Sequence, residues 1–95
     1  MTLQTRLETE LIKYTNKINQ EDSLYDNDEL STILRIVFPE CIVIIYPEGE
    51  YVEMLDDMQE YVNRGHVKEL AHDYVFVSDN YTNFSYPVLL IKEEK

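Results

Sequence analysis

The chain has 95 residues, 44% of them apolar, and its formal net charge is −11 because 19 acidic residues outnumber 8 basic ones. Residues 20–60 hold twelve acids and one base, Arg35, so this block carries the whole excess and the remaining residues are neutral in sum. Such a charge excludes binding to nucleic acid by phosphate neutralisation and disfavours an anionic membrane surface, so it leaves positively charged partners or no partner.

The length and composition predict a single folded domain over residues 1–95. Only two glycines and three prolines are present, which argues against a linker or low-complexity protein. The one cysteine, Cys41, cannot form an internal disulfide, and its apolar neighbours favour a buried thiol in a reducing compartment. We see neither a signal peptide nor a run of about 20 apolar residues, so we expect a cytoplasmic protein.

Two helices are predicted in the first forty residues. The first spans about 3–18, with Thr2 as its N-cap, because apolar side chains recur every three or four residues at Leu3, Leu7, Leu11, Tyr14 and Ile18. Residues 20–25 are then expected to be extended or loop-like. The second helix begins at a cap formed by Asp26 or Asn27 and is limited by Pro39. Its apolar stripe is Leu30, Ile33, Leu34 and Val37.

The remainder of the chain predicts mainly antiparallel strands. Residues 41–46 are continuously apolar and β-branched, which is typical of a central strand, and residues 47–50 form a turn. Residues 51–72 are ambiguous; we expect a short strand at 51–54 and an additional helix at about 56–71. Strands are expected at 74–79 and 86–92, with a loop at 80–85. The fold class is therefore α+β, with two N-terminal helices packed on a small antiparallel sheet.

Catalytic and metal-binding motifs are weak in this sequence. His66 and His72 flank Glu69, but on a helix this spacing spreads the side chains over about 120°, whereas the zinc signature needs histidines four residues apart. Asp26-Asn27-Asp28 resembles the start of an EF-hand loop, but the glycine and the closing glutamate of that loop are missing. The sequence also lacks a glycine-rich phosphate loop. We therefore expect neither an enzyme nor a bound metal or cofactor.

The acidic residues at 20–34 have two interpretations. They are explained singly as helix caps and solvated charges, which is the commoner origin of a charge run. Alternatively, they copy a phosphate backbone. Duplex DNA places a phosphate about every 6–7 Å along each strand, and alternate residues of a β-strand roughly match this at about 3.3 Å per residue. Such a surface would be drawn into the basic groove of a DNA-binding protein.

Three segments resemble the uracil-DNA glycosylase inhibitors of phages and mobile elements. Asp22-Ser23-Leu24, preceded by Gln20-Glu21, is similar to the acid-Ser-aliphatic edge-strand motif of that family, although its acid is usually Glu and its aliphatic residue Ile. Asp28-Glu29-Leu30 with Ile33-Leu34 resembles the acidic helix that follows the motif. Residues 77–79 and 86–91 resemble the C-terminal strand pair, whereas 51–72 depart from the family pattern. The match covers about half of the chain.

The resemblance implies a stoichiometric inhibitor that forms a 1:1 complex with uracil-DNA glycosylase in a bacterial host cell, without binding nucleic acid itself. An edge strand at 22–24 would enter the DNA groove of the enzyme, and acids of the second helix would extend the mimicry. The apolar stripe of that helix would enclose the leucine that the enzyme inserts into DNA. The implied contact residues are Glu21, Asp22, Ser23, Leu24, Asp28, Glu29, Leu30, Ile33 and Leu34.

Other interpretations stay open at this point. Leu30, Ile33 and Leu34 are equally explained as ordinary core residues, because helical apolar stripes pack inward by default. The target could instead be another DNA-binding defence enzyme, such as a restriction or CRISPR nuclease. In a third interpretation the protein is a small acidic adaptor whose charge only confers solubility.

Overall fold

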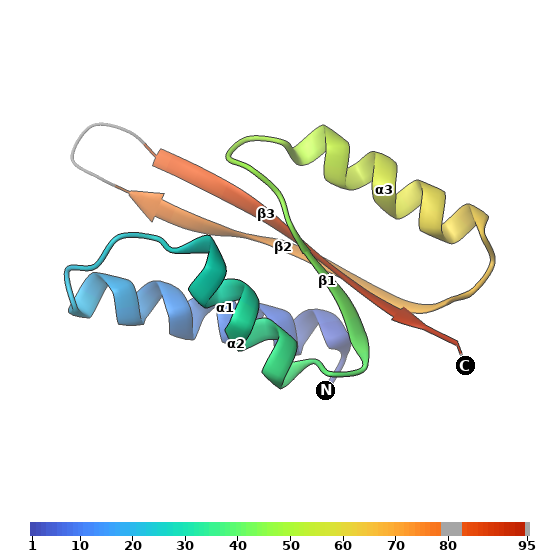
Figure 1. Ribbon diagram of the computed structural model, residues 1–95, viewed down its shortest axis with the longest axis horizontal. Coiled ribbons are helices and arrows are strands. Elements are labelled where there is room, and N and C mark those ends of the chain that lie inside the picture. Colours follow the sequence, from blue (N-terminus) through green and yellow to red (C-terminus); the bar gives the residue numbers. More distant parts are fainter. Residues whose placement is uncertain (79–82, 95) are drawn as a thin grey trace.

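The computed structural model describes residues 1–78 and 83–94 and contains three helices and three strands (Figure 1). In chain order these are α1 (Leu3–Gln20), α2 (Asn27–Val37), β1 (Cys41–Ile45), α3 (Tyr51–Asn63), β2 (Val67–Ser78) and β3 (Asn83–Glu93). The predicted α+β class with two N-terminal helices is confirmed. So are the two N-caps, because the side chain of Thr2 accepts from the Thr5 N–H and that of Asp26 accepts from two amides of α2.

The sheet is antiparallel and has the order β1-β3-β2, so the last strand of the chain is the central one. The expectation that 41–46 forms a central strand is wrong: β1 lies at an edge and pairs only with β3, from Cys41 opposite Lys92 to Ile45 opposite Val88. Both runs are apolar, but only 88–91 is fully buried, whereas β1 side chains remain partly exposed. The sequence of a run alone does not say how many neighbours it has.

The segment 51–72 differs most from the expectation, whereas the strand expected from residue 74 is present as the second half of β2. Residues 51–54 begin α3 instead of forming a strand, and 67–71 belong to β2 instead of a helix. Gly65, at φ 73°, separates the two elements in a left-handed conformation that favours glycine. Residues 83–85, expected in a loop, lie in β3. Asp79, expected at the end of a strand, and residues 80–82, expected in a loop, lie outside the described residues.

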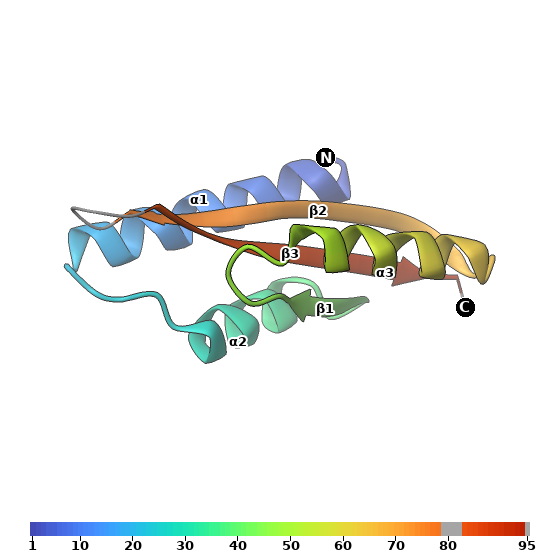
Figure 2. The ribbon, with the colours of Figure 1, turned by 90° about the horizontal axis from the view of Figure 1, so that it is seen from above.

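Helices cover both faces of the sheet, in three layers (Figures 1 and 2). Alternate residues of β3 point to opposite faces. Val88 and Leu90 pack in the cluster that includes α1 and α2, whereas Leu89 and Ile91 pack with Met54 of α3. Figure 1 shows α1 and α2 on one side of the strands and α3 on the other. Because α3 is the lone helix on its side, it covers that face incompletely.

We predict that α3 depends on one buried side chain. Met54 is its only fully buried residue, so Met54→Ala should lower the free energy of unfolding by about 2–5 kcal/mol through lost burial and a residual cavity. The control is Val52→Ala, because Val52 is largely exposed on the same helix and its truncation should cost less than about 0.5 kcal/mol. Urea unfolding measures both. Equal losses of the free energy of unfolding in the two variants would contradict the assignment of Met54 as the side chain on which α3 depends.

Candidate protein-binding surface

The connection between α1 and α2 starts with a defined helix end. The Ser23 N–H donates to the Ile18 carbonyl at 2.8 Å, and the Asp22 N–H donates to the Asn19 carbonyl at 3.4 Å. This pair of bonds is the Schellman arrangement, and it requires a left-handed residue, here Asp22 at φ 50°. Asp and Asn tolerate this conformation better than most residues other than glycine. The chain therefore leaves α1 in a fixed direction.

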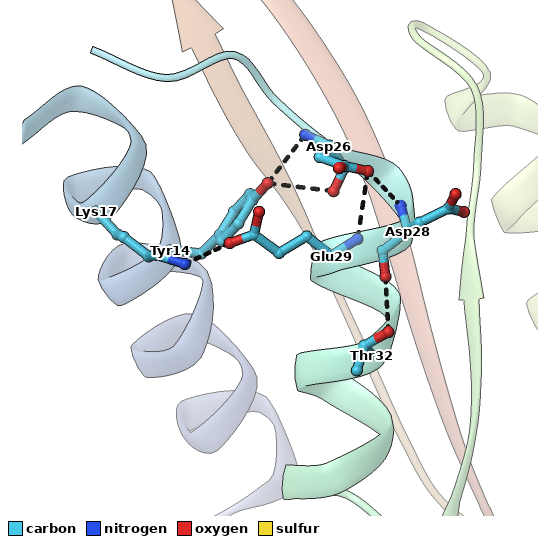
Figure 3. Close-up of polar contacts among 6 residues, drawn as sticks. All are labelled: Tyr14, Lys17, Asp26, Asp28, Glu29 and Thr32. Atoms are coloured by element: carbon cyan, nitrogen blue, oxygen red, sulfur yellow. Dashed lines mark hydrogen bonds and ion pairs between the residues drawn. The ribbon is translucent and has the colours of Figure 1, made fainter. Parts of the chain in front are cut away.

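Tyr14 fixes the other end of the connection, where α2 begins (Figure 3). Its buried hydroxyl donates to the Asp26 carbonyl at 3.2 Å and accepts from the Asp26 N–H at 3.0 Å. The Asp26 carboxylate in turn accepts from the amides of Asp28 and Glu29 at 2.9 and 3.3 Å. One side chain of α1 thus holds the N-cap of α2 through both backbone groups of Asp26.

A tyrosine directly before the N-cap of α2 ties the connection to the sheet. The Tyr25 ring stacks on Tyr86 of β3, with centroids 3.9 Å apart and planes at 9°, and meets Tyr14 edge-on at 6.1 Å. Tyr25 also packs against the core that α1 and α2 share. These contacts hold both ends of the connection, residues 21–26, although the connection is not itself a helix or strand.

Several of the expected contact residues lie in this connection and in the first turn of α2. Glu21, Asp22, Ser23, Leu24 and Asp28 are all exposed, and Leu24 is 88% exposed although it is apolar. Figure 3 shows the Asp28 carboxylate pointing away from Tyr14 and Lys17. The structure thus brings carboxylates, a hydroxyl and an aliphatic side chain to one end of the helical layer.

Glu29 has a different environment from its acidic neighbours. It is half-buried and forms an ion pair with Lys17 of α1, so part of its charge is already compensated within the chain (Figure 3). The side-chain contact with Glu29 raises the pKa of the Lys17 ammonium above its ordinary value. Glu29 therefore fastens α2 to α1 and contributes less free charge than Asp28.

The expected edge strand at 22–24 is not formed. These residues lie in the connection between α1 and α2, and the strands of the described chain lie elsewhere. The physical reason is the left-handed Asp22, which turns the chain back from α1 and cannot sit within a strand. The alternate spacing of carboxylates that a strand would supply is consequently absent from this segment.

The three apolar residues of α2 that were assigned to a leucine-binding pocket pack inward. Leu30 and Leu34 are fully buried in the core cluster, and Ile33 is half-buried against it. Their interpretation as ordinary core residues describes them better, because Leu30 and Leu34 could meet a partner only after the core opened. Leu24 is the apolar residue of the predicted contact set that is available at the surface.

Nine carboxylates within 20–60 have no ion pair with a base in the part of the chain that the structure describes. The other three pair with Lys17, Arg6 and Arg64, which all lie outside this block. The nine fall into a group at the connection and a group around α3, and all but Asp57 are exposed. They are Glu21, Asp22, Asp26 and Asp28, and then Glu48, Glu50, Glu53, Asp56 and Asp57.

Sequence reasoning missed the tyrosines that position the connection. Tyr14 was recognised only as part of an apolar stripe, and Tyr25 and Tyr86 were assigned no role. A tyrosine at a buried helical position is a usable signal, because its hydroxyl needs a polar partner when buried. The partner is Asp26, twelve residues away, and its identity depends on how the helices pack.

The two histidines and Glu69 do not lie on one helix. His66 lies in the turn before β2 and His72 lies within that strand, so they do not share a helix with Glu69. Across residues 1–78 and 83–94, no cluster of three or more potential metal ligands occurs. Within the same residues, no helix is both long enough and apolar enough to cross a membrane.

Comparisons with known proteins found no family model, no curated protein and no solved structure that matches this chain.

We predict that Tyr14→Phe lowers the free energy of unfolding by about 1–3 kcal/mol, since it leaves the Asp26 N–H without its partner and the Asp26 carbonyl with the Leu30 N–H as its remaining donor. Tyr25→Phe is the matched control: its hydroxyl makes one long, exposed contact with Asn27, so its loss should cost less than about 0.5 kcal/mol. Urea denaturation followed by circular dichroism compares the two. An unchanged stability of Tyr14→Phe would contradict the role of this hydroxyl.

Alkaline pH should destabilise the fold through three tyrosines. Burial raises the pKa of Tyr14, Tyr25 and Tyr46 above the usual value of about 10, and the hydrogen bond to Asp57 raises that of Tyr46 further. The folded state keeps these protons where the unfolded chain loses them. The free energy of unfolding is therefore at its full value below pH 10 and falls above it.

Denaturant unfolding between pH 8 and pH 11.5, together with tyrosinate absorbance at 295 nm, measures this effect. Tyr25→Phe should show a shallower decline in the free energy of unfolding than the unchanged protein, because one of the three contributing groups is removed. A free energy of unfolding that stays constant up to pH 11.5 would contradict the raised pKa values of these tyrosines.

Proposed function

We propose that the protein is a DNA mimic that inhibits a DNA-binding enzyme by occupying its basic DNA groove. Uracil-DNA glycosylase is the target that the sequence resemblance favours. The protein would act stoichiometrically, in a 1:1 complex, and would perform no chemistry of its own. Restriction and CRISPR nucleases are the alternative targets of the same mode.

One observation carries the proposal: the nine carboxylates that lack an ion pair with a described base. A solvated acidic face would serve solubility equally well if its charges were dispersed among bases. Here one segment of the chain concentrates the excess, and its three compensated acids use bases from outside it. Uncompensated surface charge of one sign speeds encounter with an oppositely charged groove and selects against acidic partners.

The hydrogen-bonded ends of the connection also support the proposed DNA mimicry. Groups that are already fixed before binding lose less conformational entropy when a partner engages them. The backbone of Asp22 is set by the end of α1, and that of Asp28 by the capped start of α2.

The departures from the inhibitor family alter the proposed contact surface. Without a strand at 22–24, the carboxylates at the connection would approach the enzyme from a helix end and a turn. With Leu30 and Leu34 in the core, Leu24 is the candidate for apolar contact with the groove. The primary contact set is thus Glu21, Asp22, Ser23, Leu24 and Asp28, with Glu29 at its margin.

We predict that the protein abolishes uracil excision by uracil-DNA glycosylase near one-to-one stoichiometry. A triple variant Glu21→Gln, Asp22→Asn, Asp28→Asn should weaken inhibition by about tenfold to a hundredfold and flatten its salt dependence. These substitutions keep side-chain volume, and asparagine tolerates the left-handed conformation of residue 22. Asp26 is left unchanged because it caps α2.

The matched control carries Glu53→Gln, Asp56→Asn and Glu50→Gln, three neutralised acids of the α3 group. It should inhibit as well as the unchanged protein if the connection is the contact surface. Loss of inhibition in this control alone would move the contact to α3. Parallel cleavage assays with a restriction enzyme and with Cas9 distinguish the target, and full activity of all three enzymes at tenfold excess would favour the adaptor interpretation.

A further inference from the structure

The outer edge of β2 is only partly covered. Along a strand the backbone N–H and C=O of successive residues point alternately to the two sides. The backbone N–H and C=O of His72 point outward, away from β3. The side chain of Gln4 donates to this carbonyl at 2.7 Å and accepts from this N–H at 3.0 Å. The outward residues that follow are Tyr74 and Phe76. The Tyr74 N–H donates to the carboxylate of Asp73, at 2.8 Å.

From the Tyr74 carbonyl to Phe76 the edge is open within the described residues. In the described part of the chain, no hydrogen bond engages the Tyr74 carbonyl or the outward N–H and C=O of Phe76. The pairing of β2 with β3 is regular here, from His72 opposite Leu89 to Ser78 opposite Asn83, so the alternation holds. An open edge of this kind is a template on which another strand can pair, unless a charge, a proline or a bulge blocks it.

Two hollows flank the open edge. One, of about 420 Å³, lies between α1 and β2 and is lined by Ile12 and Glu8 on the helix and Asp73 on the strand. The other, of about 430 Å³, lies on the α3 side and is lined by Tyr51, Ser85 and Pro87. Tyr74 and Phe76 line both hollows. An added strand places alternate side chains on opposite faces, so one set would enter each hollow.

The side chains around the edge are apolar and exposed. Phe76 is 54% and Ile12 is 61% exposed, and the Tyr74 ring contacts Phe76 edge-on at 4.7 Å and Tyr51 at 6.2 Å. Exposed aromatic groups that already touch one another present a preformed surface, and tyrosine rings also attract Lys and Arg side chains. This surface is separate from the carboxylates at the connection.

We propose that the outer edge of β2 at Tyr74–Phe76 binds an extended segment of a partner protein, in which apolar residues alternate with Lys or Arg. The charge of the edge selects this occupant. Glu8 and Asp73 line the hollow beside α1, and neither hollow is lined by a base. A second copy of this chain would bring another −11 to the same edge, which opposes self-pairing. The site goes beyond DNA mimicry and does not depend on it.

The probe is a capped synthetic octapeptide of alternating valine and arginine, titrated into the ¹⁵N-labelled protein at 150 mM salt. We expect amide shifts centred on Ile12, Tyr74 and Phe76, and at least tenfold slower hydrogen exchange of the Phe76 amide. The same peptide with a central valine replaced by proline should bind at least tenfold more weakly, because proline cannot donate to the edge. Alternating valine and glutamate should not bind.

Two protein variants complete the test. Ile12→Lys places a positive charge, the same sign as that of the peptide, beside the hollow and should weaken peptide binding at least tenfold. Val62→Lys lies on the exposed surface of α3 and should leave peptide binding unchanged. Shifts confined to residues 21–28 or to α3, or equal binding of the proline peptide, would overturn the proposal. So would sedimentation of the free protein as a dimer with the Phe76 amide already protected, which would make a second copy the occupant.

Discussion

The central strand β3 must bury both of its faces, and this requirement organises the rest of the molecule. Val88 to Ile91 are fully buried, and their alternate side chains pack in two separate hydrophobic clusters. One face needs α1 and α2, and the other needs α3. Because a single helix cannot cover a sheet with strands of eleven and twelve residues, aromatic side chains stay exposed beyond α3. The three-layer arrangement also separates the acidic connection from the acidic helix.

A second constraint acts on the connection between the first two helices. α1 lies along β2 and α2 lies along β1, so the chain must cross from one edge of the sheet to the other. It does so in a few residues, with a left-handed Asp22 at one end and an N-cap Asp26 at the other. The hydroxyl of Tyr14 and the ring of Tyr25 hold this crossing to the core. The same constraint that closes the fold therefore fixes the carboxylates that we assign to partner binding.

The parts of the fold that local patterns determine were predictable from the sequence. α1 and α2 were predicted because their apolar spacing and their caps are local features. The region 51–72 was not, since strand β2 is covered on both faces over part of its length and lacks the alternation that marks a half-buried strand. The central position of β3 and the contact of Tyr14 with Asp26 are long-range consequences of packing. For the candidate site, the exposure of the acidic side chains could be predicted from their charge. The burial of Leu30 and Leu34 could be established only from the tertiary structure.

In the proposed function, the acidic connection competes with DNA for a basic groove. The most direct measurement is displacement of fluorescently labelled single-stranded DNA from uracil-DNA glycosylase, followed by anisotropy as the protein is added. We expect complete displacement near one equivalent, with an apparent affinity that falls as salt rises. DNA that stays bound at a tenfold excess of the protein in low salt would contradict it.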